Sequence, residues 1–417
     1  MRITRRGLAL ASGSALLLGG RPARAETTVK QVWIGWPDEQ IKPMVDAFEK
    51  SAADVKVSYE RIPFSDIFQT LEIRLGARTA EPDLFSCDSP LTASYAVRNQ
   101  AMALDDVLDR KRFSPGAAAA GTYKGKLYSM PEATSSQLLF YNRALFKQAG
   151  VEPPAADVTK RWTWEQVVEA GRKMADPAKN QWGIILEQAE RAYQLLPFGQ
   201  SLGGVALSED GLQATGYLDS PAFVEGFGFL QKMYTEWKIA PAGMFDNNIT
   251  PDLFGTGRTA MFVGNTFDLD TFAQKYKDLD WGVAPHPYFA HGKPVTPTGS
   301  WHIAVNPRTR NRDAVARYLQ FLSSDDMGVL FFKLRPYPPV LPSVWDKLPE
   351  AFDNPTWRIV RYELDNTASP RPSTPGFREF EELMRLMLRD LQSPGNVKQM
   401  LTDTAQKIDR EMQKYRS

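Results

Sequence analysis

Between residues 29 and 88 the sequence alternates β-rich segments with amphipathic helical stretches, and this alternation limits the possible folds more than any other feature. In the first helical stretch, apolar residues stand at positions 41, 44, 45 and 48, the spacing of one helix face. Strands joined through helices favour right-handed crossovers and a mostly parallel sheet. The expected strands are 29–36, 55–59 and 83–87, and the expected helices are 41–50 and 67–76.

The same alternation continues along the rest of the chain. A chain of 417 residues is too long for one ordinary hydrophobic core, so we expect an α/β protein with two lobes. In such sheets ligands bind beyond the carboxyl ends of the strands. Further expected strands are 137–141, 182–186, 260–263, 281–284 and 302–305, and further expected helices are 164–174, 222–238, 314–323, 376–391 and 396–415.

The first 25 residues have the three parts of an export signal: a basic start, a short apolar stretch and a small-residue ending at Ala25. Arg5-Arg6 is similar to the twin-arginine type of leader, with an ordinary Sec leader as the alternative. Cleavage after Ala25 would leave a mildly acidic chain, which has no general attraction to nucleic acid. The single cysteine, Cys87, is expected to be a buried hydrophobe that carries neither a disulfide nor a lipid. A periplasmic protein is therefore expected.

Patterns typical of catalysis or metal binding are weak in this sequence. The three histidines, His286, His291 and His302, fall in no metal-binding spacing, so neither a metal nor a cofactor is expected. No GxSxG or Walker motif occurs. Paired acids such as Glu381-Glu382 are interpreted as solvent-facing. A glycosidase with two separated carboxylates stays open as an alternative, and no catalytic residue is assigned.

Aromatic residues stand at several expected loops beside polar neighbours. A sugar ring has C–H groups on its faces and hydroxyls around its rim, so it suits an aromatic plate surrounded by polar side chains. This combination favours a carbohydrate-binding cleft. The aromatic residues concerned are Trp36, Phe64, Tyr193, Phe198, Trp301 and Tyr337.

Four motif blocks, taken in order along the chain, resemble the maltose-type extracellular solute-binding proteins of ABC importers. The first block contains YKGKLYSMP at 123–131 and LFYNRALF at 139–146. The others are FGTGRTAM at 254–261, IAVNP at 303–307 and RPSTPGF at 371–377. The resemblance implies two α/β lobes joined by crossing hinge segments, with a solute clamped between them on closure. It implies an N-terminal lobe of 26–134 and 302–345 and a C-terminal lobe of 135–301 and 346–417.

The resemblance also implies a role and a set of pocket residues. The role is delivery of a sugar or similar solute to the permease subunits of an importer, by a monomer with no enzymatic activity. The residues that fall on the family's pocket loops, together with Phe64, are Trp36, Asp38, Glu39, Asp88, Ser89, Ser135, Tyr193, Gln200, Asn265, Thr266, Gly299, Trp301, Arg335 and Arg371.

The sequence departs from the maltose pattern at two of the family's acidic positions. Ser135 stands where that branch has a glutamate, and Arg191 occupies another acidic position. Arg335 and Arg371 would favour an anionic solute, such as a glycerol phosphate or sugar phosphate, if both lined the cleft, because guanidinium groups pair bidentately with such anions. The sequence is also compatible with a polyol as the solute, and with an open aromatic strip that binds a polymer.

Overall fold

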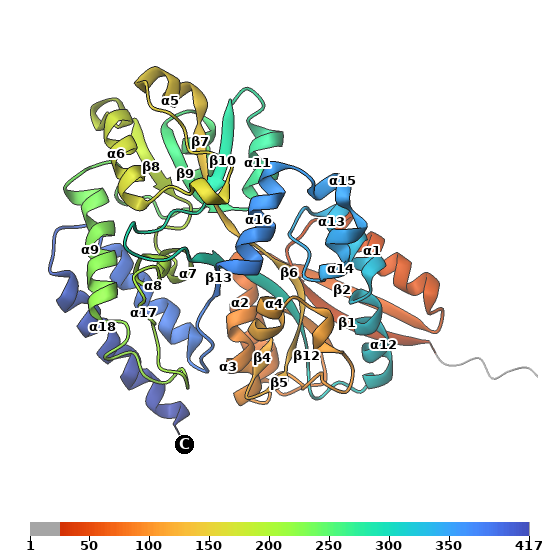
Figure 1. Ribbon diagram of the computed structural model, residues 1–417. Coiled ribbons are helices and arrows are strands. Elements are labelled where there is room, and N and C mark those ends of the chain that lie inside the picture. Colours follow the sequence, from red (N-terminus) through yellow and green to blue (C-terminus); the bar gives the residue numbers. More distant parts are fainter. Residues whose placement is uncertain (1–25, 417) are drawn as a thin grey trace, which may run out of the picture.

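The computed structural model describes residues 26–416, which form two lobes with β13 between them (Figure 1). The expected export signal at 1–25 lies outside the described residues. Among residues 26–416, no helix is both long and apolar enough to cross a bilayer. The two-lobed α/β fold expected from the sequence is confirmed.

The sheet of the first lobe has the strand order β2–β1–β3–β12–β6. Strand β1 pairs in parallel with β2 and β3, whereas β12 runs antiparallel to β3 and β6. Four strands thus share one direction and β12 is reversed. The bounds are β1 (Thr27–Ile34), β2 (Val55–Ile62), β3 (Leu84–Asp88), β6 (Ser129–Thr134) and β12 (Ser300–Val305).

The sheet of the second lobe has the order β10–β7–β9–β8, and here β7 is the reversed strand. Every residue of β7 and β9 is buried, which explains why both read as continuous apolar runs. Phe140 and Phe262 on these strands pack against Phe272 from a covering helix. The bounds are β7 (Gln137–Asn142), β8 (Trp182–Leu186), β9 (Thr259–Asn265) and β10 (Trp281–Pro285).

Helices around the first sheet begin earlier than the hydrophobic periodicity indicated. Asp38 and Glu39 occupy the first turn of α1, where the positive end of the helix dipole favours acidic side chains. This first lobe contains α1 (Asp38–Ser51), α2 (Phe64–Gly76), α3 (Thr92–Val97), α4 (Pro115–Ala120), α12 (Arg312–Leu322), α13 (Asp325–Leu334), α14 (Pro342–Lys347) and α15 (Pro349–Phe352). A short hairpin, β4 (Thr122–Tyr123) and β5 (Lys126–Leu127), follows α4.

Local sequence signals define several helices of the second lobe. Thr163 and Gln166 form a capping box at the start of α6, and Gly150 ends α5 with a φ of 64°. The helices are α5 (Arg143–Ala149), α6 (Trp164–Met174), α7 (Ala192–Leu195), α8 (Pro197–Gln200), α9 (Pro221–Thr235), α10 (Thr250–Gly255), α11 (Asp268–Lys275), α16 (Pro355–Asn366), α17 (Phe377–Asp390) and α18 (Val397–Met412).

Two chain segments cross between the sheets side by side. Residues 135–136 connect β6 to β7, and Gly299 connects β11 (Thr296–Thr298) to β12. The Ser135 amide donates a hydrogen bond to the Gly299 carbonyl at 2.9 Å. Strand β13 (Ala368–Pro370) pairs in parallel with β11. The lobe boundaries expected from the sequence stay a prediction, and β12 itself begins at Ser300.

Candidate functional site

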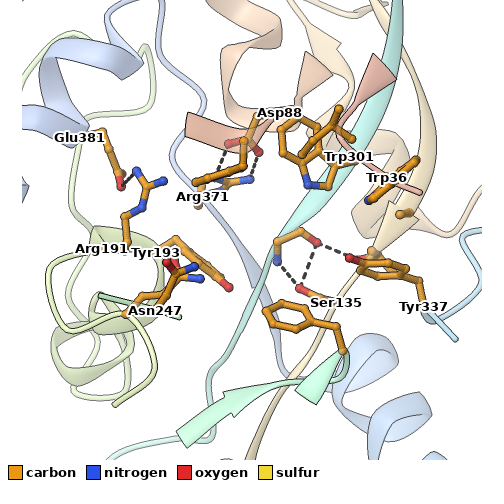
Figure 2. A pocket seen from close by; sticks show the side chains of 17 residues that line it. Trp36, Asp88, Ser135, Arg191, Tyr193, Asn247, Trp301, Tyr337, Arg371 and Glu381 are labelled. Carbon is orange, nitrogen blue, oxygen red and sulfur yellow. Dashed lines mark hydrogen bonds and ion pairs between the residues drawn. The ribbon is translucent and has the colours of Figure 1, made fainter. Parts of the chain in front are cut away.

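A cavity of about 210 Å³ lies where the two lobes face each other beside the crossing segments (Figure 2). This volume is below the ~300–1,000 Å³ of drug-sized ligand pockets, so the cavity suits a small solute. The lining residues are Ile34, Trp36, Phe64, Asp88, Ala133, Thr134, Ser135, Gln188, Arg191, Tyr193, Asn247, Phe267, Gly299, Trp301, Tyr337, Arg371 and Glu381.

The first lobe supplies residues that lie at strand ends. Trp36 follows β1, Asp88 ends β3, and Trp301 lies near the start of β12. Strand β12 runs opposite to β3, and this pairing places Trp301 across from Asp88. Phe64 begins α2 directly after β2. Because the carboxyl ends of parallel strands meet at one edge of a sheet, these side chains from distant segments reach the same cavity.

Aromatic rings form the apolar part of the cavity wall. The Trp301 ring stacks on Phe68, with ring centres 6.2 Å apart and planes 27° apart, and meets the edge of Phe64. Phe267 of the second lobe contacts Tyr337 of the first, with ring centres 6.5 Å apart. The rings therefore offer apolar faces to a solute from both lobes.

The crossing segments contribute Ser135 and Gly299, which approach each other closely. The Gly299 amide donates a hydrogen bond to Ser135 Oγ at 3.0 Å. A Cβ atom at position 299 would lie 3.1 Å from the same oxygen, closer than most real Cβ contacts. This approach favours glycine at the crossing point.

An ion pair joins the lobes across the cavity. The Arg371 guanidinium, in the segment between β13 and α17, contacts both carboxylate oxygens of Asp88, with Nη1 2.9 Å from Oδ2. Both side chains are nearly buried, at 11% and 13% exposed. Burial lowers the pKa of Arg371, but the Asp88 carboxylate outweighs it, so this pKa stands above its usual value.

A second ion pair lies beside the first, within the second lobe. Arg191 Nη1 is 3.2 Å from Glu381 Oε1, and the Arg191 guanidinium also lies over the Phe64 ring of the first lobe at 5.4 Å. Burial raises the pKa of the Glu381 carboxyl, and the guanidiniums of Arg191 and Arg371 offset only part of this effect.

A buried polar network supports the wall of the second lobe. Tyr193 lines the cavity and donates its hydroxyl hydrogen to Asn265 Oδ1 at 3.0 Å. The Asn265 amide nitrogens in turn donate to Glu187 and, from the backbone at 2.7 Å, to Asp268. Burial raises the pKa of both acids, most strongly at Asp268, where the Glu187 charge adds to the effect. The network fixes the orientation of the Tyr193 ring.

The structure brings a first set of the predicted site residues together at this cavity. They come from segments spread over more than 330 positions of the sequence. This set comprises Trp36, Phe64, Asp88, Ser135, Tyr193, Gly299, Trp301 and Arg371.

A second set of predicted residues lies away from the cavity lining. Asp38 and Glu39 are exposed on α1, and Asp38 accepts a hydrogen bond from Tyr59 instead. The remaining predicted residues outside the lining are buried or half-buried: Ser89, Gln200, Asn265 and Thr266. A role of these residues in binding stays a prediction.

Arg335, expected at the cleft, is buried behind Trp36 and does not line the cavity. It is 2% exposed, and its guanidinium carbon lies 3.5 Å from the centre of the Trp36 ring. Burial lowers its pKa to about 10. An anionic solute was expected if Arg335 and Arg371 both lined the cleft. Arg335 does not line it, so this condition is not met.

Several lining residues were not assigned to the site from the sequence. The sequence marks Tyr337 only as a loop aromatic. It interprets Glu381 as solvent-facing, whereas the structure shows its side chain only 14% exposed and paired with Arg191. No local pattern marks Gln188, Asn247 or Phe267, because they reach the cavity through tertiary packing. The other unassigned lining residues are Ile34, Ala133, Thr134 and Arg191.

Comparison with known proteins gives the family. Residues 36–329 match the family model described as bacterial extracellular solute-binding protein. A maltotriose-binding protein of Pyrococcus abyssi is 26% identical over 68% of this chain and 59% of that protein. An sn-glycerol-3-phosphate-binding periplasmic protein of Brucella melitensis is 24% identical over 57% of this chain and 55% of that protein. The chain thus matches less than two thirds of the length of either relative.

A solved structure supports the same fold. The ABC substrate-binding protein of Listeria monocytogenes in complex with cycloalternan superposes with a TM-score of 0.81 at 23% identity. The match covers 93% of this chain and 99% of that one.

Proposed function

The chain belongs to the bacterial extracellular solute-binding protein family, and from this premise we propose that it captures a small neutral sugar or sugar-like solute for an ABC importer. The observation that carries the proposal is the cavity between the lobes, which combines aromatic faces with a polar rim. Trp301, Phe64 and Tyr193 can cover the faces of a sugar ring, while the polar groups can bind its hydroxyls. The maltotriose-binding relative supports the same solute class.

Charge favours a neutral solute over the anionic alternative. The charged residues that line the cavity are Asp88, Glu381, Arg191 and Arg371, two acids and two bases. Each arginine contacts one of the acids, so neither guanidinium lacks a counterion. The glycerol-phosphate-binding relative is the reason to keep an anionic solute or a polyol in the test.

Capture is proposed to proceed by closure of the lobes about the crossing segments. The closed form buries the solute between Trp36 and Trp301 on one side and Tyr193 on the other, and it would be the form that the permease subunits recognise. The protein is proposed to act as an exported periplasmic monomer without turnover. The two lining acids are engaged by arginines, which argues against the pair of working carboxylates that a glycosidase needs.

A titration panel tests the proposal. Calorimetry and thermal shift would compare glucose, maltose, maltotriose, glycerol and sn-glycerol 3-phosphate with the same protein preparation. Binding of at least one neutral sugar, with a raised melting temperature, is the expected result. Binding confined to sn-glycerol 3-phosphate would favour the anionic alternative, and hydrolysis of a chromogenic glycoside would overturn the proposed role.

A further inference from the structure

We propose that Asp88 and Glu381 set the charge selectivity of the cavity by neutralising its two arginines, so that neutral solutes are accepted and anionic ones rejected. The inference rests on the proposed function, that the cavity captures a small solute. Asp88 and Glu381 then serve to exclude anions, and they do not react with the solute.

The first acid acts through the ion pair between the lobes. Asp88 accepts from both terminal nitrogens of Arg371. A phosphate or sulfonate would seek the same two donors, because guanidinium groups bind such anions bidentately. Asp88 therefore occupies the position that an anionic solute would need (Figure 2).

The second acid acts through Arg191. Glu381 Oε1 accepts from Arg191 Nη1, and Glu381 Oε2 is buried without a hydrogen-bond partner among the described residues. Arg371 Nε is likewise without a partner within residues 26–416. Both atoms are shielded from solvent, so neither is an open partner for an anionic solute.

The surroundings of Asp88, Arg191, Arg371 and Glu381 strengthen the discrimination against anionic solutes. They also line an adjoining cavity of about 650 Å³ between α2, α3 and α17, so both cavities meet at this wall. Burial lowers the local dielectric and makes an uncompensated like-charge contact costly. An anion that enters the cavity would therefore meet the carboxylates of Asp88 and Glu381 at little distance and with little screening.

Closure makes the selectivity depend on both lobes. Asp88 belongs to the first lobe, whereas Arg191, Arg371 and Glu381 belong to the second. When the lobes approach, Asp88 meets Arg371. An anion already bound to Arg371 would oppose this approach by repulsion, whereas a hydroxyl would not. Closure therefore acts as the step that rejects anions.

A pair of matched probes tests the inference. Glycerol and sn-glycerol 3-phosphate differ by one phosphate group, and both would be titrated into the wild type and into Asp88→Asn and Glu381→Gln. Each substitution removes one negative charge and leaves one guanidinium without its counterion. We expect each variant to gain at least about tenfold in affinity for sn-glycerol 3-phosphate, with no comparable gain for glycerol.

The control is Glu382→Gln, the neighbouring acid in the sequence. Its side chain is 56% exposed and pairs with Arg385, so its loss should leave anion affinity unchanged. Circular dichroism would verify folding, and if Asp88→Asn does not fold, Glu381→Gln decides.

The inference would be overturned by folded variants that gain no affinity for sn-glycerol 3-phosphate over the wild type, or that gain as much for glycerol. Neither result depends on which sugar the wild type binds, so failure of the solute-capture proposal in the sugar panel is a separate result.

Discussion

The guanidinium of Arg335 lies against the Trp36 indole, with its central carbon 3.5 Å from the ring centre. It also lies 4.2 Å from the centre of the Phe331 ring, so the cation is enclosed by aromatic groups. Trp36 lines the cavity and Arg335 does not. Arg335 therefore supports the aromatic plate from behind.

Replacing Arg335 by alanine is expected to loosen Trp36. The free energy of unfolding should fall by about 2 kcal/mol, the order of a desolvated cation–π contact. Affinity for the tightest sugar of the panel should fall about tenfold, or ~1.4 kcal/mol. Denaturant melts measure the change in the free energy of unfolding, and calorimetry measures the change in sugar affinity. Arg361→Ala is the control, since Arg361 covers Trp345 at 5.7 Å with a half-exposed side chain. Unchanged sugar affinity in Arg335→Ala would show that Trp36 needs no such support.

Trp301→Ala tests the aromatic wall directly. The indole stacks on Phe68 and lines the cavity. Its loss should weaken sugar binding by about 2 kcal/mol, roughly 30-fold, because buried aromatic anchors dominate binding energy. Calorimetry with the tightest sugar measures this loss. Trp237→Ala is the matched control, because Trp237 lines a surface hollow with Phe229 on α9 instead. Equal losses in the two variants would count against a ligand contact at Trp301.

Gly299→Ala tests the crossing segments. The added Cβ would lie 3.1 Å from Ser135 Oγ, so the two segments must separate slightly. We expect sugar affinity to fall about tenfold (~1.4 kcal/mol), with part of the loss recovered in the double variant Ser135→Ala, Gly299→Ala. Gly228→Ala on α9, where nothing lies within 4 Å, should bind normally and gain ~0.5–1 kcal/mol in stability. Additive losses in the double variant would contradict the proposed clash.

Glu132 is expected to make stability depend on pH. Burial raises the pKa of its carboxyl to about 7, and neighbouring Arg335 offsets only part of this. An acid with a higher pKa in the folded chain stabilises folding at low pH. The stabilisation is lost as pH rises from the unfolded pKa near 4.5 to about 7. The loss amounts to at most about 3 kcal/mol.

Glu132→Gln should therefore raise the free energy of unfolding more at pH 8 than at pH 4, as measured by urea melts at several pH values. Burial lowers the pKa of His286 and His302 to about 3, which destabilises the folded form below pH 6.5. The two histidines change the free energy of unfolding with pH in the opposite direction, and they do so in both proteins. The difference in the free energy of unfolding between variant and wild type therefore isolates Glu132. The exposed Glu236→Gln serves as the control. If the difference in the free energy of unfolding between Glu132→Gln and the wild type were the same at every pH, Glu132 would not be the source of the pH dependence.

Local patterns predicted the elements of the fold well, and the reason is physical. The period of apolar residues reports which face of a helix or strand is buried. This explains why the strands 55–59 and 83–87 were expected close to the observed β2 and β3. Asp38 and Glu39 were expected on pocket loops but lie in the first turn of α1, because helix starts favour acids that carry no apolar signal.

The sequence alone determined the alternation of strands and helices, the two-lobed family and the strand ends that carry Trp36 and Asp88. Only the tertiary structure decided how the charges pair. Arg371 meets Asp88 across 283 positions of the chain, and Arg191 meets Glu381 across 190. Periodicity describes neighbours along one element, whereas ion pairing depends on distance in space. Thus Arg371 reached the cavity wall, and Arg335, beside Phe331 and Trp36, became buried behind it.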